Sequence, residues 1–193
     1  MEQLKFVVCV IESPSAVDLY HLRSEGDVLV DALRLAGIPA VSRLVVSGSA
    51  LEAAFVVGMR ETMEEYSDHV PIVHISAHGS DDGIGLTDGT LVSWRNLREM
   101  LKPINAALDG NLLLCMSACH GAAACRMAME LDRELPFFAV IGPVDSPTWS
   151  DTAVAYLSFY HLIRKGAKVR DAVAGMCAAS GVESFVNMFA HDA

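Results

Sequence analysis

The sequence predicts a three-layer α/β fold in which a mainly parallel β-sheet is covered by helices on both faces. Short apolar, often β-branched runs alternate with longer segments of helical periodicity, and the runs are apolar at nearly every position. Strands of that kind are typical of a parallel sheet that is buried on both faces. The chain has 193 residues, of which 52% are hydrophobic and 20% are charged, which suffices for one core. We therefore expect a single domain over residues 1–193.

The alternation of strands and helices begins at the N-terminus. Residues 4–11 are an apolar run closed by a Glu-Ser-Pro turn, and residues 41–46 are a second run, so both are predicted strands. Between them, apolar side chains recur near helical spacing over residues 16–35, where Gly26 marks a potential break. Residues 51–66 are predicted as a helix whose glutamates face solvent.

The middle of the chain adds two strands and a hairpin. Residues 70–77 and 111–117 are continuous apolar runs, which predicts buried strands. Residues 83–94 hold an Asp-Gly pair between short apolar pairs, the pattern of a hairpin, here an insertion. Residues 94–108 are amphipathic with helical spacing, so a helix is expected between the hairpin and the following strand.

The last third of the chain continues the pattern. Residues 137–144 are predicted as a strand, and residues 149–164 and 169–179 as helices separated by Gly166. Residues 122–135 are rich in Ala and Met and are predicted as a further helix. The sequence contains neither an internal repeat nor a linker.

Charge and composition exclude several classes of partner. A formal charge of −10 repels phosphate backbones and anionic lipids, so neither nucleic acid nor a membrane surface is expected. The apolar runs are much shorter than the roughly 20 residues of a membrane helix, and the N-terminus lacks the pattern of a signal peptide. The five cysteines are odd in number and lie mostly in apolar contexts, which favours reduced thiols and a cytoplasmic location.

Two predicted strands end in residues that can carry chemistry. One ends in Ala77-His78-Gly79, and another ends in Ala118-Cys119 just before a predicted helix. Carboxyl ends of parallel strands meet at one edge of the sheet, where α/β folds place their sites. His74 and Cys115 lie inside the same strands, so we expect His74 to be hydrogen-bonded or partly exposed and Cys115 to be inert core.

A thiol and an imidazole at one sheet edge indicate nucleophilic catalysis. We expect Cys119 to be the nucleophile, made more reactive by the N-terminus of the helix that follows it, and His78 to be the general base and later the acid. The backbone amides of Gly79 and Cys119 are the predicted oxyanion hole. The first product would be an acyl-enzyme.

These residues resemble the signature of the caspase-like cysteine peptidases of clan CD. The stretch Ala118-Cys119-His120-Gly121 fits the Ala-Cys-x-Gly part of the caspase pattern, with His78 lying 41 residues upstream where about 50 is usual. The resemblance covers most of the chain. It implies a caspase-like fold and a cysteine endopeptidase that cleaves protein substrates without a cofactor or a metal.

The region after the nucleophile is similar to one branch of that family. Ile141-Gly142-Pro143, Trp149, Asp151, Phe159-Tyr160 and Gly166 look like the strand and helix that follow the cysteine in bacterial CHAT domains, a branch that includes separase-like peptidases. The resemblance implies a minimal, unprocessed domain that is controlled by a separate regulatory or sensor protein. Bacterial signalling or antiviral defence is the setting that such a pairing suggests.

The sequence departs from the family where substrates are chosen. Caspases carry Gln and metacaspases carry Asp two residues before the cysteine, but this chain has Ser117, so neither P1 preference can be transferred. The family places its specificity pocket at loops after the first and fifth strands. The resemblance therefore nominates, as pocket residues, Glu12, Ser13, Ser117, Asp145, Ser146 and Trp149. Glu12 or Asp145 would favour a basic P1 side chain, and Trp149 an apolar one.

Three other interpretations stay open at this point. In one alternative the chain is a caspase-like interaction or adaptor domain, whose peptidase activity is switched on by a partner or is never switched on. It is alternatively another thiol hydrolase or a redox sensor, for which Cys125 is the nearby candidate for a resolving cysteine. A zinc site is disfavoured because the cysteines lack close Cys-x-x-Cys pairs.

Overall fold

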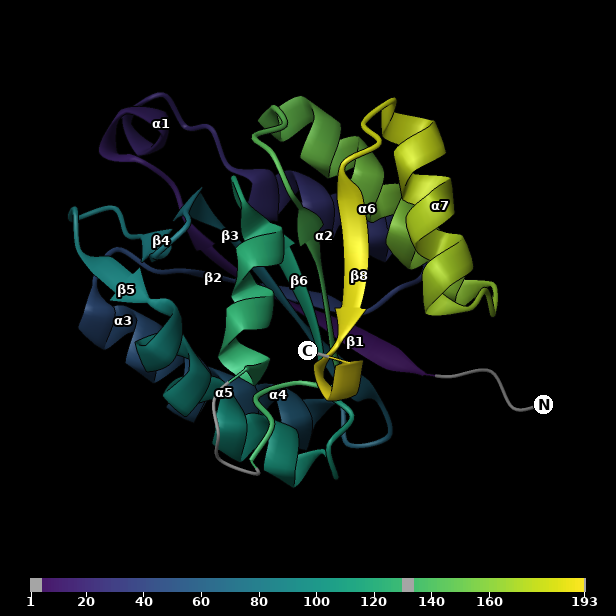
Figure 1. Ribbon diagram of the computed structural model, residues 1–193, viewed down its shortest axis with the longest axis horizontal. Helices are drawn as coiled ribbons and strands as arrows, with labels where there is room; N and C mark the ends of the chain where they lie inside the picture. The colour runs from purple at the N-terminus through teal and green to yellow at the C-terminus, as the bar shows by residue number, and fades with distance from the viewer. Residues whose placement is uncertain (1–4, 130–133, 193) are drawn as a thin grey trace.

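A six-stranded sheet with the order β2-β1-β3-β6-β7-β8 forms the centre of the molecule (Figure 1). The computed structural model describes residues 5–129 and 134–192. Neighbouring strands run parallel except β7 and β8, which are antiparallel. The strands are β1 (Phe6–Ser13), β2 (Ala40–Leu44), β3 (Val70–Ser80), β6 (Leu113–Ser117), β7 (Ala139–Pro143) and β8 (Phe185–Phe189). The predicted mainly parallel sheet is confirmed.

Helices cover both faces of this sheet, which completes the predicted three layers (Figure 1). One face packs against α3 (Gly48–Ala53), a π-helical turn (Ala54–Gly58), α4 (Met59–Glu65) and α5 (Trp94–Ala107). The other face packs against α2 (Glu25–Leu35), α6 (Trp149–Arg164) and α7 (Val169–Ser180). Every residue of β1, β6 and β7 is buried, because each strand contributes side chains to both cores. No helix among the described residues is long and apolar enough to cross a bilayer.

The segment between β1 and α2 departs from the prediction of one helix over residues 16–35. It contains a short helix, α1 (Ala16–Tyr20), and α2 begins only after residues 21–24. Each helix has its own serine cap: Ser15 accepts a hydrogen bond from the Asp18 amide, and Ser24 accepts one from the Asp27 amide. The interruption therefore precedes Gly26, which lies within α2.

The predicted hairpin is confirmed. It consists of β4 (Gly83–Gly85) and β5 (Leu91–Ser93), which pair antiparallel, and β4 also pairs with the end of β3. The pairing of β3 with β4 includes His78 opposite Gly85 and Gly79 opposite Ile84. The hairpin therefore extends β3 beyond the main sheet and supports the segment that carries His78.

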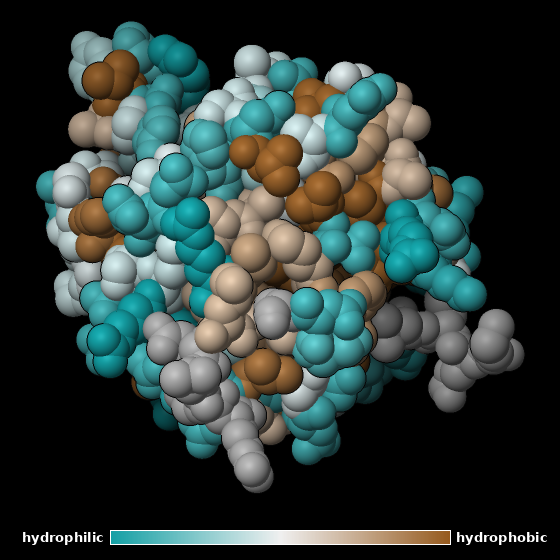
Figure 2. Space-filling view, in the orientation of Figure 1, coloured by the Kyte–Doolittle hydropathy of each residue, from teal (hydrophilic) through white to brown (hydrophobic). Residues whose placement is uncertain are grey.

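The prediction of an α-helix over residues 122–135 is wrong for the part that the structure describes. Gly121–Ala128 form a 3₁₀ helix, and residues 130–133 lie outside the described residues. The backbone here is pressed against β7, since a Cβ atom on Gly142 would lie 2.7 Å from the Gly121 carbonyl carbon. Figure 2 shows weakly hydrophobic residues over the middle of this face, where the Ala-rich segment lies.

Strand β8 is a second difference, because no strand was predicted after α7. Its residues Phe185–Phe189 pair antiparallel with β7 at the edge of the sheet. Four of its five residues are only partly buried, so the strand lacks the fully apolar pattern of the inner strands. A last 3₁₀ turn, Ala190–Asp192, follows it.

His74 lies in the middle of β3 and is completely buried, so of the two expected alternatives, hydrogen-bonded or partly exposed, the structure confirms the first. Its Nδ1 lies 2.8 Å from the Tyr160 hydroxyl oxygen, and its ring packs edge-on against Tyr156. Its Nε2 has no hydrogen-bond partner among the described residues. Burial lowers the pKa of His74 from 6.5 to about 3, so the folded protein holds a neutral imidazole.

This buried imidazole predicts a loss of stability in acid. An unfolded chain takes up the proton near pH 6.5 but the folded chain only near pH 3, so the stabilisation is complete above pH 6.5 and falls as the pH drops toward 3. The slope is roughly 1.4 kcal/mol per pH unit. Urea unfolding between pH 7 and pH 4 should show this slope in the wild type and in a His21→Gln control, whose histidine is exposed. A His74→Leu variant that keeps the full slope would contradict the assignment.

Candidate active site

The pairing of β3 with β6 brings the two predicted catalytic residues to neighbouring strand ends. Ser76 on β3 is directly opposite Ser117 on β6. His78 and Cys119 each follow two residues later, His78 within β3 and Cys119 on the turn after β6. Both lie at the carboxyl edge of the sheet, as the sequence predicted.

Direct backbone contact joins the two segments. A Cβ atom built on Gly79 would lie 2.0 Å from the Cys119 carbonyl oxygen and 3.0 Å from the Ala118 Cβ atom. No side chain fits in that space, so the Gly after His78 is required by the approach of the Cys119 backbone. The amides of Gly79 and Cys119, which the sequence nominates as an oxyanion hole, belong to these two touching segments.

Cys119 lies on a tight turn between β6 and the 3₁₀ helix. The next residue, His120, has a left-handed backbone conformation with φ 53°, and its amide donates to the Asp145 carbonyl oxygen at 2.8 Å. The helix that follows is 3₁₀ and not α, which corrects the environment expected for the thiol. Cys119 is partly exposed and forms no disulfide.

The cysteines inside the strands have a different environment. Cys9 and Cys115 are buried, and burial raises the pKa of each thiol to about 12. A thiol in that state is a poor nucleophile because the thiolate is the reactive form. The expectation that Cys115 is inert core is confirmed, and Cys119 is the cysteine at the strand end that reagents can reach.

His78 has an exposed side chain and a carboxylate neighbour that sequence reasoning missed. Its Nε2 lies 3.7 Å from Oδ2 of Asp18, and the His78 side chain is 54% exposed. Asp18 is held in the first turn of α1, where its carboxylate accepts a hydrogen bond from Ser15 and lies 3.4 Å from Arg23. The Ser15-x-x-Asp18 capping pattern was visible in the sequence, but nothing there indicated the contact with His78.

Three of the nominated pocket residues contact His78 or His120 at this edge. The Trp149 ring centre lies 6.2 Å from that of His78. The Asp145 carbonyl accepts from the His120 amide, and its carboxylate accepts a hydrogen bond from Ser184. Ser146 Oγ lies 3.5 Å from His120 Nε2.

The other three nominated residues lie inside the fold beneath this edge. Glu12, Ser13 and Ser117 are all buried. Ser13 donates to the Val45 carbonyl at 2.6 Å, and Glu12 accepts from Ser24 and from the Glu25 amide. Their polar groups are satisfied within the protein and face no solvent in this structure.

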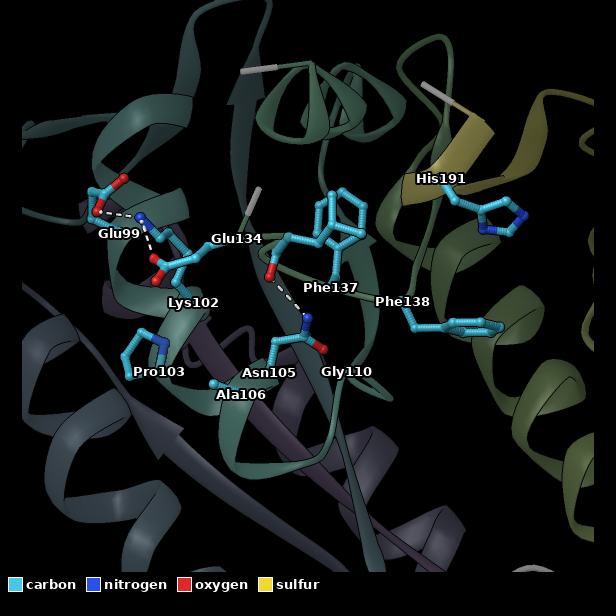
Figure 3. A pocket seen from close by; sticks show the side chains of 11 residues that line it. Glu99, Lys102, Pro103, Asn105, Ala106, Gly110, Glu134, Phe137, Phe138 and His191 are labelled. Carbon is cyan, nitrogen blue, oxygen red and sulfur yellow. Dashed lines mark hydrogen bonds and ion pairs between the residues drawn. The ribbon is translucent and has the colours of Figure 1, made fainter. Parts of the chain in front are cut away.

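The cavity drawn in Figure 3 lies at the opposite edge of the sheet. It has a volume of about 640 Å³ and includes Phe137, which precedes β7, and His191, which follows β8. Lys102 lies there between Glu99 and Glu134 (Figure 3). Neither Cys119 nor His78 lines this cavity. No group of three or more His, Cys, Asp or Glu side chains that could hold a metal occurs among residues 5–129 and 134–192.

Several solved cysteine peptidases resemble this chain. The Arg-specific cysteine proteinase gingipain R superimposes with a TM-score of 0.56 at 9% identity, over 96% of this chain and 46% of that one. The complex of the RgpB pro- and mature domains from Porphyromonas gingivalis gives 0.55 at 10%, over 96% and 47%. Caspase-1 from Spodoptera frugiperda gives 0.59 at 14%, over 93% and 78%. The chain has a caspase-like fold.

The predicted fold is therefore confirmed, although the likeness extends to structure and hardly to sequence. The chain spans about half the length of the gingipain chains that it matches. No protein-family model matches the sequence, and no curated protein matches it significantly. At these identities the comparisons establish the arrangement of the caspase-like sheet and helices, while the chemistry rests on the residues at the strand ends.

The contact at Gly79 predicts that any side chain there disrupts the site. In Gly79→Ala the added Cβ meets a backbone oxygen, which cannot rotate away, so the strand ends must separate. We expect labelling of Cys119 by a thiol-directed probe to fall at least ~10-fold, and the melting temperature to fall by roughly 2–12 °C. Gly48→Ala is the matched control because a Cβ there meets no atom within 4 Å. Unchanged labelling in Gly79→Ala would refute the close approach.

Proposed function

We propose that this chain is a cysteine endopeptidase that cleaves protein substrates through Cys119 and His78. The observation that carries the proposal is the backbone contact between Gly79 and Cys119, which holds the two strand ends together. An exposed imidazole and a partly exposed thiol then lie at neighbouring strand ends. The likeness to cysteine peptidases of known fold supports the same chemistry.

The proposed reaction proceeds through an acyl-enzyme. His78 accepts the thiol proton of Cys119, and the sulfur attacks the carbonyl carbon of the scissile peptide. The amides of Gly79 and Cys119 donate to the oxyanion that develops. His78 then gives its proton to the leaving amine. Water, deprotonated by His78, hydrolyses the thioester and releases the new carboxyl terminus.

Asp18 is the third member of the proposed site. It faces the His78 Nε2 atom, so the other ring nitrogen, Nδ1, is the one left to exchange the proton with the thiol. The negative charge of Asp18 attracts the positive charge that develops on the ring when Cys119 gives up its proton. Because the His78 side chain is more than half exposed, solvent weakens this effect to about 1 kcal/mol or less.

The substrate pocket is proposed around the same edge. Trp149, Asp145 and Ser146 are the proposed walls, and Glu12, Ser13 and Ser117 lie beneath them. Gingipain R is described as Arg-specific. Of the two acidic candidates only Asp145 is exposed, so its carboxylate is the proposed partner of a basic P1 side chain. The partly buried Trp149 adds an apolar surface for the substrate chain.

Control by another protein completes the proposal. We propose one cytoplasmic peptidase domain of the CHAT-like branch, regulated by a sensor protein in bacterial signalling or antiviral defence. One gingipain structure is a complex of the mature domain with its pro-domain, which supports regulation of this fold by protein contacts. The excess of acidic residues is consistent with a protein partner and not with nucleic acid.

Removal of either dyad residue should abolish cleavage. A diverse peptide library incubated with the wild type should yield products, and Cys119→Ala and His78→Ala should reduce the rate by about 10³-fold or more. Cys125→Ala is the control, because it removes another partly exposed thiol and leaves the dyad intact. Cleavage that survives Cys119→Ala would reject the assignment, and a wild type that cuts nothing while Cys119 labels like an ordinary thiol would favour the adaptor interpretation.

Loss of the Asp18 carboxylate should lower the cleavage rate less than loss of Cys119 or His78. Asp18→Asn keeps the shape and removes the charge beside His78, so kcat should fall about 5-fold, which corresponds to ~1 kcal/mol. The loss should shrink in 1 M salt, because ions already screen the wild-type pair. Asp27→Asn, an acidic residue of the α2 first turn, serves as the control. An effect of Asp18→Asn that is independent of salt would argue against an electrostatic role.

A further inference from the structure

A buried carboxylate connects the two strands directly beneath the dyad. Glu25 is the first residue of α2, and only 4% of it is exposed. The Ser76 hydroxyl of β3 donates to its Oε2 at 2.5 Å. The Ser117 hydroxyl of β6 donates to Oε1 at 2.8 Å and to Oε2 at 2.7 Å. One side chain therefore bridges both strands.

The bridge lies at a defined distance from the catalytic residues. Ser76 and Ser117 are opposite each other in the β3–β6 register, and each lies two residues before His78 or Cys119. Residues two apart in a strand point to the same face and are separated by about 6.6 Å along it. This holds for Ser76 and His78 within β3, while Cys119 lies on the turn two residues after Ser117. A change in the spacing of the two serines therefore acts only two residues from the imidazole and the thiol.

Glu25 is itself held firmly. Its amide donates to Oε1 of Glu12 at 2.6 Å, and the Ser24 hydroxyl donates to Oε2 of the same carboxylate at 2.6 Å. Farther along α2, Leu29 and Leu33 are buried against the sheet. The start of α2 is therefore attached to β1, and the Glu25 side chain accepts hydrogen bonds from β3 and β6 at this anchored point.

Retaining this carboxylate is costly for the fold. Burial raises the pKa of Glu25, and the charge of Glu12 adds to the increase, while hydrogen bonds from Ser76, Ser117 and Thr152 oppose it. An apolar side chain would avoid this cost. A function for the hydrogen bonds from Ser76 and Ser117 explains why a carboxylate, and not an apolar side chain, occupies position 25.

We propose that Glu25 is a positioning residue, which links β3 to β6 through Ser76 and Ser117 and so sets the separation of Cys119 and His78. The inference rests on the proposed function, because it assigns a support to that dyad. The essential property is the reach of the side chain to two hydroxyls. Displacement of a reacting group by about 1 Å can cost ~10²-fold in rate.

The test measures how strongly His78 affects the reactivity of Cys119. Alkylation by iodoacetamide at neutral pH, followed by mass spectrometry of the Cys119 peptide, gives a rate with His78 present and a rate in the His78→Ala background. Their ratio reports the coupling of the pair without needing a substrate. A general loss of stability lowers the melting temperature but leaves this ratio unchanged, so the ratio separates positioning from folding.

Three substitutions of Glu25 distinguish reach from charge. Glu25→Gln keeps the reach and the hydrogen bonds, and its ratio should stay within about threefold of the wild type. Glu25→Asp keeps the charge but is one methylene shorter, and Glu25→Ala removes the bridge, so both ratios should approach one. Where cleavage is measurable, kcat should fall with little change in KM. Leu33→Ala is the control, since Leu33 is fully buried on the same helix. This substitution lowers the stability of the fold without changing the hydrogen bonds to the serines.

The outcomes separate the two proposals. Equal alkylation rates with and without His78 in the wild type would refute the dyad, and the role of Glu25 with it. A large wild-type ratio that persists in Glu25→Ala and Glu25→Asp would refute the positioning role alone, and a ratio lost in Glu25→Gln but kept in Glu25→Asp would show that charge is the essential property. If Glu25→Ala does not fold, Ser76→Ala and Ser117→Ala remove one contact each and should each lower the ratio severalfold.

Discussion

The parallel pairing of β3 with β6 in the middle of the sheet is the constraint on which the site depends. Ladder hydrogen bonds hold Ser76 opposite Ser117, the last residues of this pairing. The pairing is buried on both faces, and three residues beyond Ser76 the Gly79 backbone closely approaches that of Cys119. A one-residue slip in the register would separate these two segments and turn the side chains of one strand to the opposite face of the sheet.

The apolar sheet carries a small set of buried polar residues along this central pair. His74 and Cys115 are opposite each other deep in the core, whereas Ser76, Ser117 and Glu25 lie near the catalytic edge. The deep pair is held uncharged, since burial lowers the pKa of His74 and raises that of Cys115. Closer to the edge the buried side chains are more polar, and the hydroxyls of Ser76 and Ser117 both donate hydrogen bonds to Glu25. Cys115 and Cys119 are four residues apart, and solvent access distinguishes the buried thiol from the partly exposed one.

The caspase-like fold combines this edge with loops that come from distant parts of the chain. Asp18 arrives from α1, Trp149 from the start of α6, and the hairpin of β4 and β5 extends β3 at the point where His78 lies. The sheet and its helices are shared with gingipain R and caspase-1 at identities of 9% and 14%. Conserving a sheet edge while varying its loops allows one fold to serve different substrates.

The sequence by itself determined the class of fold, most strands and helices, and the two motifs at the strand ends, because apolar periodicity and turn residues are local properties of the chain. Helix α6 begins and ends where the pattern predicted. Only the tertiary structure decided the 3₁₀ helix after Cys119, the edge strand β8, and the contacts of Asp18 with His78 and of Glu25 with the two serines. These depend on contacts between distant residues: Glu25 lies 51 residues from Ser76 and 92 from Ser117. Local patterns do not encode such distances, since they are set when the sheet is assembled.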